Sequence, residues 1–376
     1  MSVWALGSNS SGQLGTGNEE DAHYPTPSIL PPQARIGHIV GGGNHVFGWP
    51  RDGTQLYACG SNANGELGDT HALDSRADKS ESPQHQWRAT KQPEGGIRQI
   101  ACGWNHSLLL TNDGRVYATG SNRYGQLGNG AQDKGVFKWA AVDTMPSIIA
   151  VACGMRHSMV LTESGQVYAW GANRSSQLGC SSKASIPAPL CVSAGLPPIA
   201  MVSCGRNHSV LIAQDHRTVF VAGQDKYGQC GPSTSEFVAG TWRKFTLPGS
   251  ARKLCCQWDA CVVLLQPKQE VGNLVMWGRA DHGQLAAEAN GGLSRMLVQV
   301  PLLADDVACG SNHTLAKTRD GLVYAWGWNE HGNAGDPKLQ NVFVPREIVA
   351  NSSVADAASA VGIGCGYGNS FVFDQS

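Results

Sequence analysis

The sequence predicts an all-β fold, a seven-bladed β-propeller whose ring is closed by pairing of the N- and C-terminal strands. Two observations predict it. One glycine-containing pattern occurs seven times along the 376-residue chain, and a second pattern precedes it in each period. Successive copies are about 49 to 60 residues apart by subtraction of their residue numbers, close to the length of one four-stranded blade. We therefore expect one propeller domain over residues 1–376.

The first pattern consists of two hydrophobic residues, a small residue, a variable residue, glycine and a turn that ends in Gln-Leu-Gly. Its clearest copies are residues 116–128 and 167–179. Glycine suits such positions because it tolerates positive φ and close approach of another backbone. The first glycines of the seven copies are Gly7, Gly60, Gly120, Gly171, Gly223, Gly278 and Gly327.

The second pattern is Cys-Gly, two variable residues, His, then Ser or Thr and an apolar run. Residues 255–260 are interpreted as a copy that has Asp259 in place of the histidine, with Gln257 and Trp258 as its variable pair. Polar turns such as residues 111–114 separate the two patterns and indicate β-hairpins. The best copies begin at Cys102, Cys153, Cys204 and Cys309.

The two ends of the chain complement each other. The last copy, residues 365–373, stops where its hairpin partner should begin, and residues 3–7 supply that missing strand. Pairing of the termini in one composite blade would close the ring and leave no exposed sheet edge.

Composition favours a globular protein with a large core, because 41% of the residues are hydrophobic and 15% are charged. The net charge is -1. With no basic run in the sequence, we expect neither direct DNA binding nor membrane binding. No secretory leader is apparent, so we expect a cytoplasmic protein with the nucleus as an alternative location. The polar segment 69–96 is longer than its counterparts and is expected to be an exposed insertion.

The recurring histidines and cysteines are interpreted as structural. One His per blade would spread these side chains around a ring, whereas zinc needs its ligands around one point. Cys255, Cys256 and Cys261 form the one cluster in the sequence, and whether they are redox-active is left open. No catalytic or phosphate-binding motif appears, so we expect no enzyme, no cofactor and no metal. The recurring histidines are His45, His106, His157, His208 and His313.

The variable residues after each Cys-Gly are the candidate partner-binding residues, because seven such loops should converge on one face around the central channel. Aromatic, Met and Arg side chains are typical of binding hot spots. The alternative is that some of them fill the channel mouth. Trp328 is a further candidate that could lie on this face or on the opposite rim. The candidates in the loops are Trp104, Asn105, Met155, Arg156, Arg206, Asn207, Trp258 and Tyr367.

Together the two patterns resemble the regulator-of-chromosome-condensation repeat family. Trp-Asp repeats do not fit, since that dipeptide occurs only at residues 258–259. Within the family, residues 3–15, 254–258 and 323–333 are similar to the fungal alpha-tubulin suppressors, also known as killer-toxin-insensitivity factors.

That resemblance implies a non-catalytic adaptor. It would heterodimerise with a small zinc-binding protein that serves diphthamide synthesis on elongation factor and the Elongator complex, which modifies wobble uridines of transfer RNA. The Elongator complex itself is a further partner implied in this way. The family also offers an alternative, guanine-nucleotide exchange on a small GTPase, as performed by its founding member. Photoreception, as in the related plant ultraviolet-B photoreceptor, is disfavoured because tryptophan occupies only two of the variable pairs.

Overall fold

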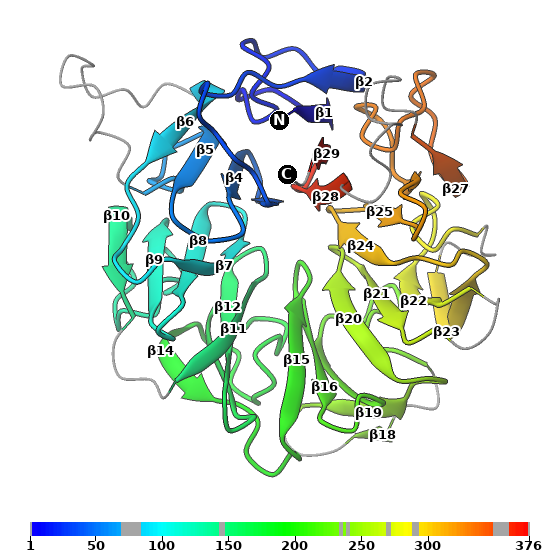
Figure 1. Cartoon of the computed structure of the whole chain (residues 1–376). Helices are drawn as coiled ribbons and strands as arrows, with labels where there is room; N and C mark the ends of the chain where they lie inside the picture. Colours follow the sequence, from blue (N-terminus) through cyan, green and yellow to red (C-terminus); the bar gives the residue numbers. More distant parts are fainter. Residues whose placement is uncertain are drawn as a thin grey trace.

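The computed structural model describes residues 2–68, 84–142, 147–232, 236–237, 241–267, 272–287, 293–348 and 361–374. Seven β-sheets stand around a central channel (Figure 1). The predicted seven-bladed, all-β propeller is confirmed. Among the described residues there is no helix, and hence none that could span a membrane.

Each blade is an antiparallel sheet that extends outward from an inner strand at the channel (Figure 1). The inner strands are β3 (His38–Gly41), β7 (Ile97–Cys102), β11 (Ile148–Cys153), β15 (Ile199–Cys204), β20 (Ala251–Cys256), β24 (Asp306–Cys309) and β28 (Val361–Cys365). We number the blades 1 to 7 in that order. The second strands are β4 (His45–Trp49), β8 (His106–Thr111), β12 (His157–Thr162), β16 (His208–Ala213), β21 (Ala260–Leu265), β25 (His313–Lys317) and β29 (Asn369–Asp374).

The third strands carry the first pattern and end at or beside its first glycine. They are β5 (Leu56–Gly60), β9 (Val116–Gly120), β13 (Val167–Gly171), β17 (Thr218–Gly223), β22 (Leu274–Arg279), β26 (Val323–Gly327) and β1 (Val3–Gly7). The outer strands are β6 (Gln84–Thr90), β10 (Val136–Ala141), β14 (Ile186–Cys191), β19 (Arg243–Thr246), β23 (Leu293–Val300), β27 (Val342–Glu347) and β2 (Ala22–Pro27), and β18 (Glu236–Phe237) adds to β19. Of the expected insertion, residues 69–83 lie outside the described residues and Gln84–Thr90 is outer strand β6.

The ring closes as expected. Strand β1 pairs antiparallel with β29, with Val3 opposite Phe373 and Leu6 opposite Ser370, so blade 7 combines β28 and β29 with β1 and β2. The N- and C-termini accordingly lie close together (Figure 1). Closure removes the free edge that an open stack of blades would present.

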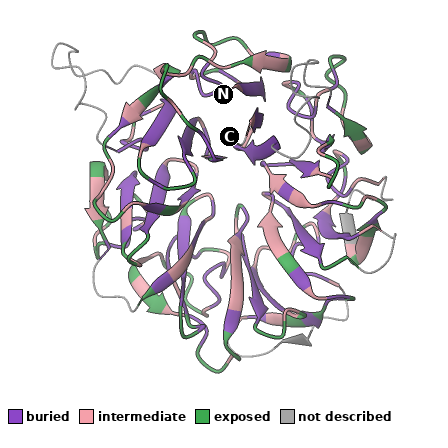
Figure 2. Cartoon of the chain, in the orientation of Figure 1, coloured by how far each residue is buried: buried purple, intermediate pink, exposed green. Residues whose placement is uncertain are grey.

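The core lies between the blades. Second strands such as β8, β12, β16 and β21 are buried along their whole length, while exposed residues gather on outer strands and connecting loops (Figure 2). Indole side chains of the third strands form hydrogen bonds with the preceding blade. Trp170 Nε1 donates to the carbonyl of Gln126 at 2.8 Å, and Trp277 Nε1 donates to that of Gln229 at 2.9 Å.

Four of the five recurring histidines join their blade to the next one through a serine. At four junctions, His at the start of a second strand contacts Ser of the next blade's second strand, with Nε2 and Oγ 2.8 to 3.0 Å apart. The serine hydroxyl in turn donates to a backbone carbonyl of the preceding blade at 2.7 to 2.9 Å. The pairs are His45–Ser107, His106–Ser158, His157–Ser209 and His313–Ser370.

These bonds fix the protonation of the imidazoles. A serine hydroxyl has one proton, which goes to the carbonyl, so the imidazole must donate from Nε2. Burial lowers the pKa of His45, His106 and His157 to about 3 and that of His313 to about 4. The folded protein therefore holds these rings neutral at physiological pH.

The expected register in blade 5 is wrong by one residue. Gln257 N donates to the carbonyl of Ala260 at 2.9 Å, just as Gly205 N donates to that of His208 in blade 4. Gln257 thus takes the glycine position and Ala260 the histidine position. Trp258 becomes the first variable residue of its loop, and Asp259 the second.

This exchange of residues is compensatory. Elsewhere the imidazole leaves no room for a side chain on the glycine, since a Cβ on Gly205 would lie 2.0 Å from Cε1 of His208. With alanine at position 260 the space is free, and Gln257 donates from Nε2 to Thr314 Oγ1 of blade 6 at 2.7 Å. The glutamine amide thereby replaces the imidazole as the link between blades.

We predict that blade 3 tolerates the same exchange. Gly154→Gln alone should destabilise the protein, because its Cβ would lie 2.1 Å from Cε1 of His157, and His157→Ala alone should leave Ser209 without its donor. In the double variant the new amide can reach Ser209. Urea unfolding should show that the double variant recovers about 1–3 kcal/mol relative to the sum of the single variants. Strictly additive losses would contradict this account.

We also predict that acid weakens the propeller through these histidines. The unfolded chain takes up protons near the ordinary imidazole pKa of 6.5, whereas His45, His106 and His157 remain neutral in the folded state down to about 3. Their contribution is therefore complete above about pH 6.5 and falls as the pH drops toward 3, by roughly 1.4 kcal/mol per pH unit for each ring.

Urea midpoints between pH 7 and pH 5 measure this loss. The variant with Gly154→Gln and His157→Ala should lose stability less steeply, because one titrating imidazole is gone. A midpoint that is constant over this range would show that the imidazoles do not titrate on unfolding.

Candidate functional site

Two sets of loops lie at one end of the ring, and we call this end the Cys-Gly face. It carries the loops between inner and second strands and those that follow the third strands. Trp328 N donates to the carbonyl of Asn312 at 2.8 Å, as Ser121 N does to that of Asn105 at 2.7 Å. Trp328 therefore lies on the Cys-Gly face together with the other candidate residues, and not on the opposite rim.

Backbone hydrogen bonds tie the Cys-Gly loops to one another around the axis. Trp104 N donates to the carbonyl of Met155 at 3.1 Å, and Arg206 N to that of Trp258 at 3.0 Å. Further bonds run from Trp258 N to Ser311 O, from Ser311 N to Tyr367 O and from Tyr367 N to Gly42 O, at 2.7 to 3.0 Å. The loops are thus held to their neighbours by backbone hydrogen bonds and do not move independently of one another.

Three of the candidate aromatic residues meet over the axis. The ring centroids of Trp104 and Trp258 are 5.6 Å apart, those of Trp104 and Tyr367 5.9 Å, and those of Trp258 and Tyr367 5.6 Å. They come from blades 2, 5 and 7, which are two or three blades apart around the ring. Side chains so placed can touch only across the channel, so this aromatic trio covers the channel mouth, the alternative role considered for these residues.

Beneath the trio lies a cavity of about 610 Å³ that occupies the channel. Cysteines that end the inner strands line it, and all 12 cysteines of the chain are free thiols. Burial raises the pKa of the Cys153, Cys204 and Cys309 thiols well above the ordinary value, so they stay protonated and are poor nucleophiles. The lining cysteines are Cys102, Cys153, Cys204, Cys255, Cys256, Cys309 and Cys365.

Blades 2 to 4 present a patch of cations on the Cys-Gly face, which we call the basic sector. Its side chains are exposed, and none forms a salt bridge within the described part of the chain. Arg156 lies over the ring of Tyr124 at 4.8 Å, and Arg206 lies over that of Trp258 at 5.2 Å. The sector consists of Arg123, Arg156, Arg174, Arg206 and Lys226.

The sequence carried a signal for the three members that were not among the candidates. Arg123, Arg174 and Lys226 each stand three residues after the first glycine of their copies. The same position holds Asp281 in blade 5 and Glu330 in blade 6, both exposed. This position is therefore basic in blades 2 to 4 and carries carboxylates in blades 5 and 6, where a neighbouring arginine neutralises Asp281.

A groove of about 180 Å³ includes two of the five cations of the basic sector, Arg123 and Arg156. Four candidate residues line it, together with Arg123, Tyr124 and other side chains of blades 1 and 2. Trp328 lies apart, in a hollow of about 600 Å³ beside His282 and Glu330. The candidates in the groove are Trp104, Asn105, Met155 and Arg156.

The remaining pair, Arg206 and Asn207, belongs to the next Cys-Gly loop. Asn207 is half-buried and donates from Nδ2 to Gln224 Oε1 at 3.1 Å. Apart from Asn207, the candidates thus divide into the aromatic trio, the residues of the groove and basic sector, and Trp328.

The family model described as the RCC1-like domain matches residues 2–372. This chain belongs to the RCC1-like family. The chain is 32% identical over 400 residues to the secretion-regulating guanine nucleotide exchange factor of Mus musculus, covering 97% of this chain and 82% of the relative. It is 30% identical over 367 residues to the ultraviolet-B receptor of Arabidopsis thaliana, covering 95% and 79%.

Two solved structures have the same fold. Yeast RCC1 (Prp20), in its complex with Kap60, matches with a TM-score of 0.83 at 23% identity, over 99% of this chain and 88% of the other. Human WBSCR16 matches with a TM-score of 0.81 at 21% identity, over the whole of both chains.

The cysteine cluster noted in this RCC1-like sequence divides in the structure. Cys255 and Cys256 are neighbours in β20 and point to opposite sides of the sheet, so Cys255 packs toward blades 6 and 7 and Cys256 toward blade 4. Cys256 meets Cys261, with their sulfurs 3.9 Å apart, and Cys261 also meets His208. Sequence spacing did not reveal His208, because it belongs to a different blade.

Proposed function

We propose that this RCC1-like chain is a non-catalytic adaptor that binds a protein partner through the Cys-Gly face. The observation that carries the proposal is the basic sector beside the groove of blades 2 and 3. Five exposed cations without salt bridges within the described residues, on a chain of net charge -1, attract an acidic surface at little desolvation cost. The hydrogen bonds between the Cys-Gly loops also favour binding, since loops that are already ordered lose little conformational entropy when a partner binds.

The proposed partner is the small zinc-binding protein that serves diphthamide synthesis and Elongator-dependent modification of transfer RNA. Its support is the resemblance of residues 3–15, 254–258 and 323–333 to the fungal alpha-tubulin suppressors, together with a basic surface suited to a small acidic protein. The exposed carboxylate of Glu330, on the other side of the face, would help to orient the partner as it approaches. We place this role in the cytoplasm, with the nucleus as an alternative location.

We predict that reversing two charges of the basic sector disrupts the heterodimer. The variant with Arg156→Glu and Arg206→Glu should bind the purified small zinc-binding protein about tenfold more weakly or worse in isothermal titration calorimetry. Wild-type binding should also weaken as salt is added. The arginines are exposed, so the melting temperature should stay close to that of the wild type.

The matched control changes the same charge on the opposite face. Arg115 and Arg319 are exposed residues in hairpins between second and third strands, and Arg115→Glu with Arg319→Glu should leave the affinity within about twofold. Equal losses in the two variants would mean that the effect is one of net charge. Unchanged binding in the first variant would refute the assignment of the face.

Guanine-nucleotide exchange on a small GTPase is the second candidate function. The observation that favours it is the 32% identity to a mouse protein named as a secretion-regulating guanine nucleotide exchange factor. Both candidates use a propeller face to hold a protein and differ in what the contact does to the partner.

A GDP-release assay separates the two candidates. If the chain is the adaptor proposed here, labelled GDP should leave each member of a panel of small GTPases within about twofold of its intrinsic rate, a change of less than about 0.5 kcal/mol in the barrier. Accelerated release from one GTPase, lost with Arg156→Glu and Arg206→Glu, would reverse the ranking.

A further inference from the structure

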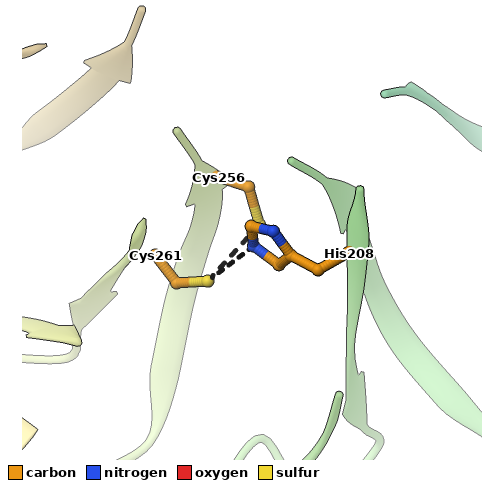
Figure 3. A group of neighbouring side chains, drawn as sticks. All are labelled: His208, Cys256 and Cys261. Carbon is orange, nitrogen blue, oxygen red and sulfur yellow. Dashed lines mark hydrogen bonds between the residues drawn. The ribbon is translucent and has the colours of Figure 1, made fainter. Parts of the chain in front are cut away.

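The junction between blades 4 and 5 differs chemically from the other histidine junctions. At four junctions the imidazole meets a serine hydroxyl, and here His208 Nε2 lies 3.1 Å from the thiol of Cys261. The sulfur of Cys256, directly across the strand pair from Cys261, lies 3.9 Å from it. Figure 3 shows the three side chains converging, from β16, β20 and β21.

One substitution accounts for this difference. A cysteine ends the inner strand in blades 2 to 7, and in blade 4 the sulfur of Cys204 lies 3.9 Å from Ser209 Oγ, which in turn faces His157. Blade 5 has Cys261 at the position of Ser209. The group of one cysteine, one serine and one histidine found in blade 4 is therefore replaced by two cysteines and one histidine.

We propose that His208, Cys256 and Cys261 form a zinc site between blades 4 and 5. Their ligand atoms all lie within 4.8 Å of one another. Tetrahedral zinc, with Zn–S near 2.3 Å and Zn–N near 2.0 Å, requires sulfurs about 3.8 Å apart and nitrogen about 3.5 Å from sulfur. The Cys256–Cys261 and His208–Cys261 separations of 3.9 and 3.1 Å are within a few tenths of an ångström of these values, and the third pair, His208 and Cys256, lies within 4.8 Å.

The charge and access of the site also suit zinc. Two thiolates and a neutral imidazole cancel the charge of Zn²⁺, which matters because His208 and Cys261 are fully buried and an uncompensated buried charge is costly. Cys256 lines the channel cavity, which gives an ion a route to the site and leaves the fourth position to water. Among the described residues no other group of three such ligands comes together.

The test is zinc content, measured on the full chain purified in reducing buffer, stripped with chelator and dialysed against zinc. Mass spectrometry of the metal should find about one zinc per wild-type chain and none in Cys261→Ser. That variant should fold, because serine is the residue that faces histidine at the other junctions. Cys255→Ser, which changes a neighbouring thiol that points to the other side of β20, should keep its zinc.

A gain-of-site variant strengthens the test. Ser209→Cys places a second thiol between His157 and Cys204 with the same separations, and it should raise the content to about two zinc ions per chain. Zinc should also raise the melting temperature of the wild type and leave that of Cys261→Ser unchanged. A wild-type chain without zinc, or a Cys261→Ser chain that retains it, would overturn the proposal.

Discussion

The fold depends on a side-chain hydrogen bond that fastens one blade to the next near the start of the second strand, at six of the seven junctions. The bond requires an imidazole that donates, a hydroxyl that accepts this bond while donating its own hydrogen bond to a backbone carbonyl, and a glycine that leaves space for the imidazole. These three requirements explain why Gly, His and Ser recur together. The pattern describes a junction between blades, not a unit of any one blade, so its residues are constrained by partners about 50 residues away.

The exceptions obey the same constraint. In blade 5 the donor moves from the histidine position to the glycine position, and Gln257 still reaches a hydroxyl in blade 6. Where blade 7 meets blade 1, Asn369 stands in the histidine place and Val46 in the place of the hydroxyl, so the acceptor is missing. These two blades are joined instead by the backbone hydrogen bond from Tyr367 N to the carbonyl of Gly42 at 3.0 Å. The histidine is thus absent where its hydroxyl partner is absent, as expected for a buried donor that is costly to leave alone.

Much of the fold could be predicted from the sequence because its signals are local and periodic. Glycine turns, hairpin turns and an unmatched strand at each end led directly to seven blades and to closure between Val3 and Phe373. The register of blade 5 could not be predicted, since Gln257 and Ala260 fit only once the space left by the missing imidazole is known. The aromatic trio and the contact of His208 with Cys261 join residues from different blades, and a repeat pattern does not show which side chains meet across an axis or a junction.

The division of the candidate residues follows from the geometry of a ring. Loop residues nearest the axis converge whatever their role. Aromatic side chains at these positions therefore pack against one another over the channel, and Trp258 is half-buried for this reason. Residues farther from the axis diverge and remain exposed, which is where Arg123, Arg174 and Lys226 lie. Substitutions at these outer positions can therefore change the surface charge without disturbing the junctions. In this chain the outer positions carry cations in blades 2 to 4 and the exposed carboxylate of Glu330 in blade 6, so the charges on which the proposed partner would depend are separate from the residues that hold the ring together.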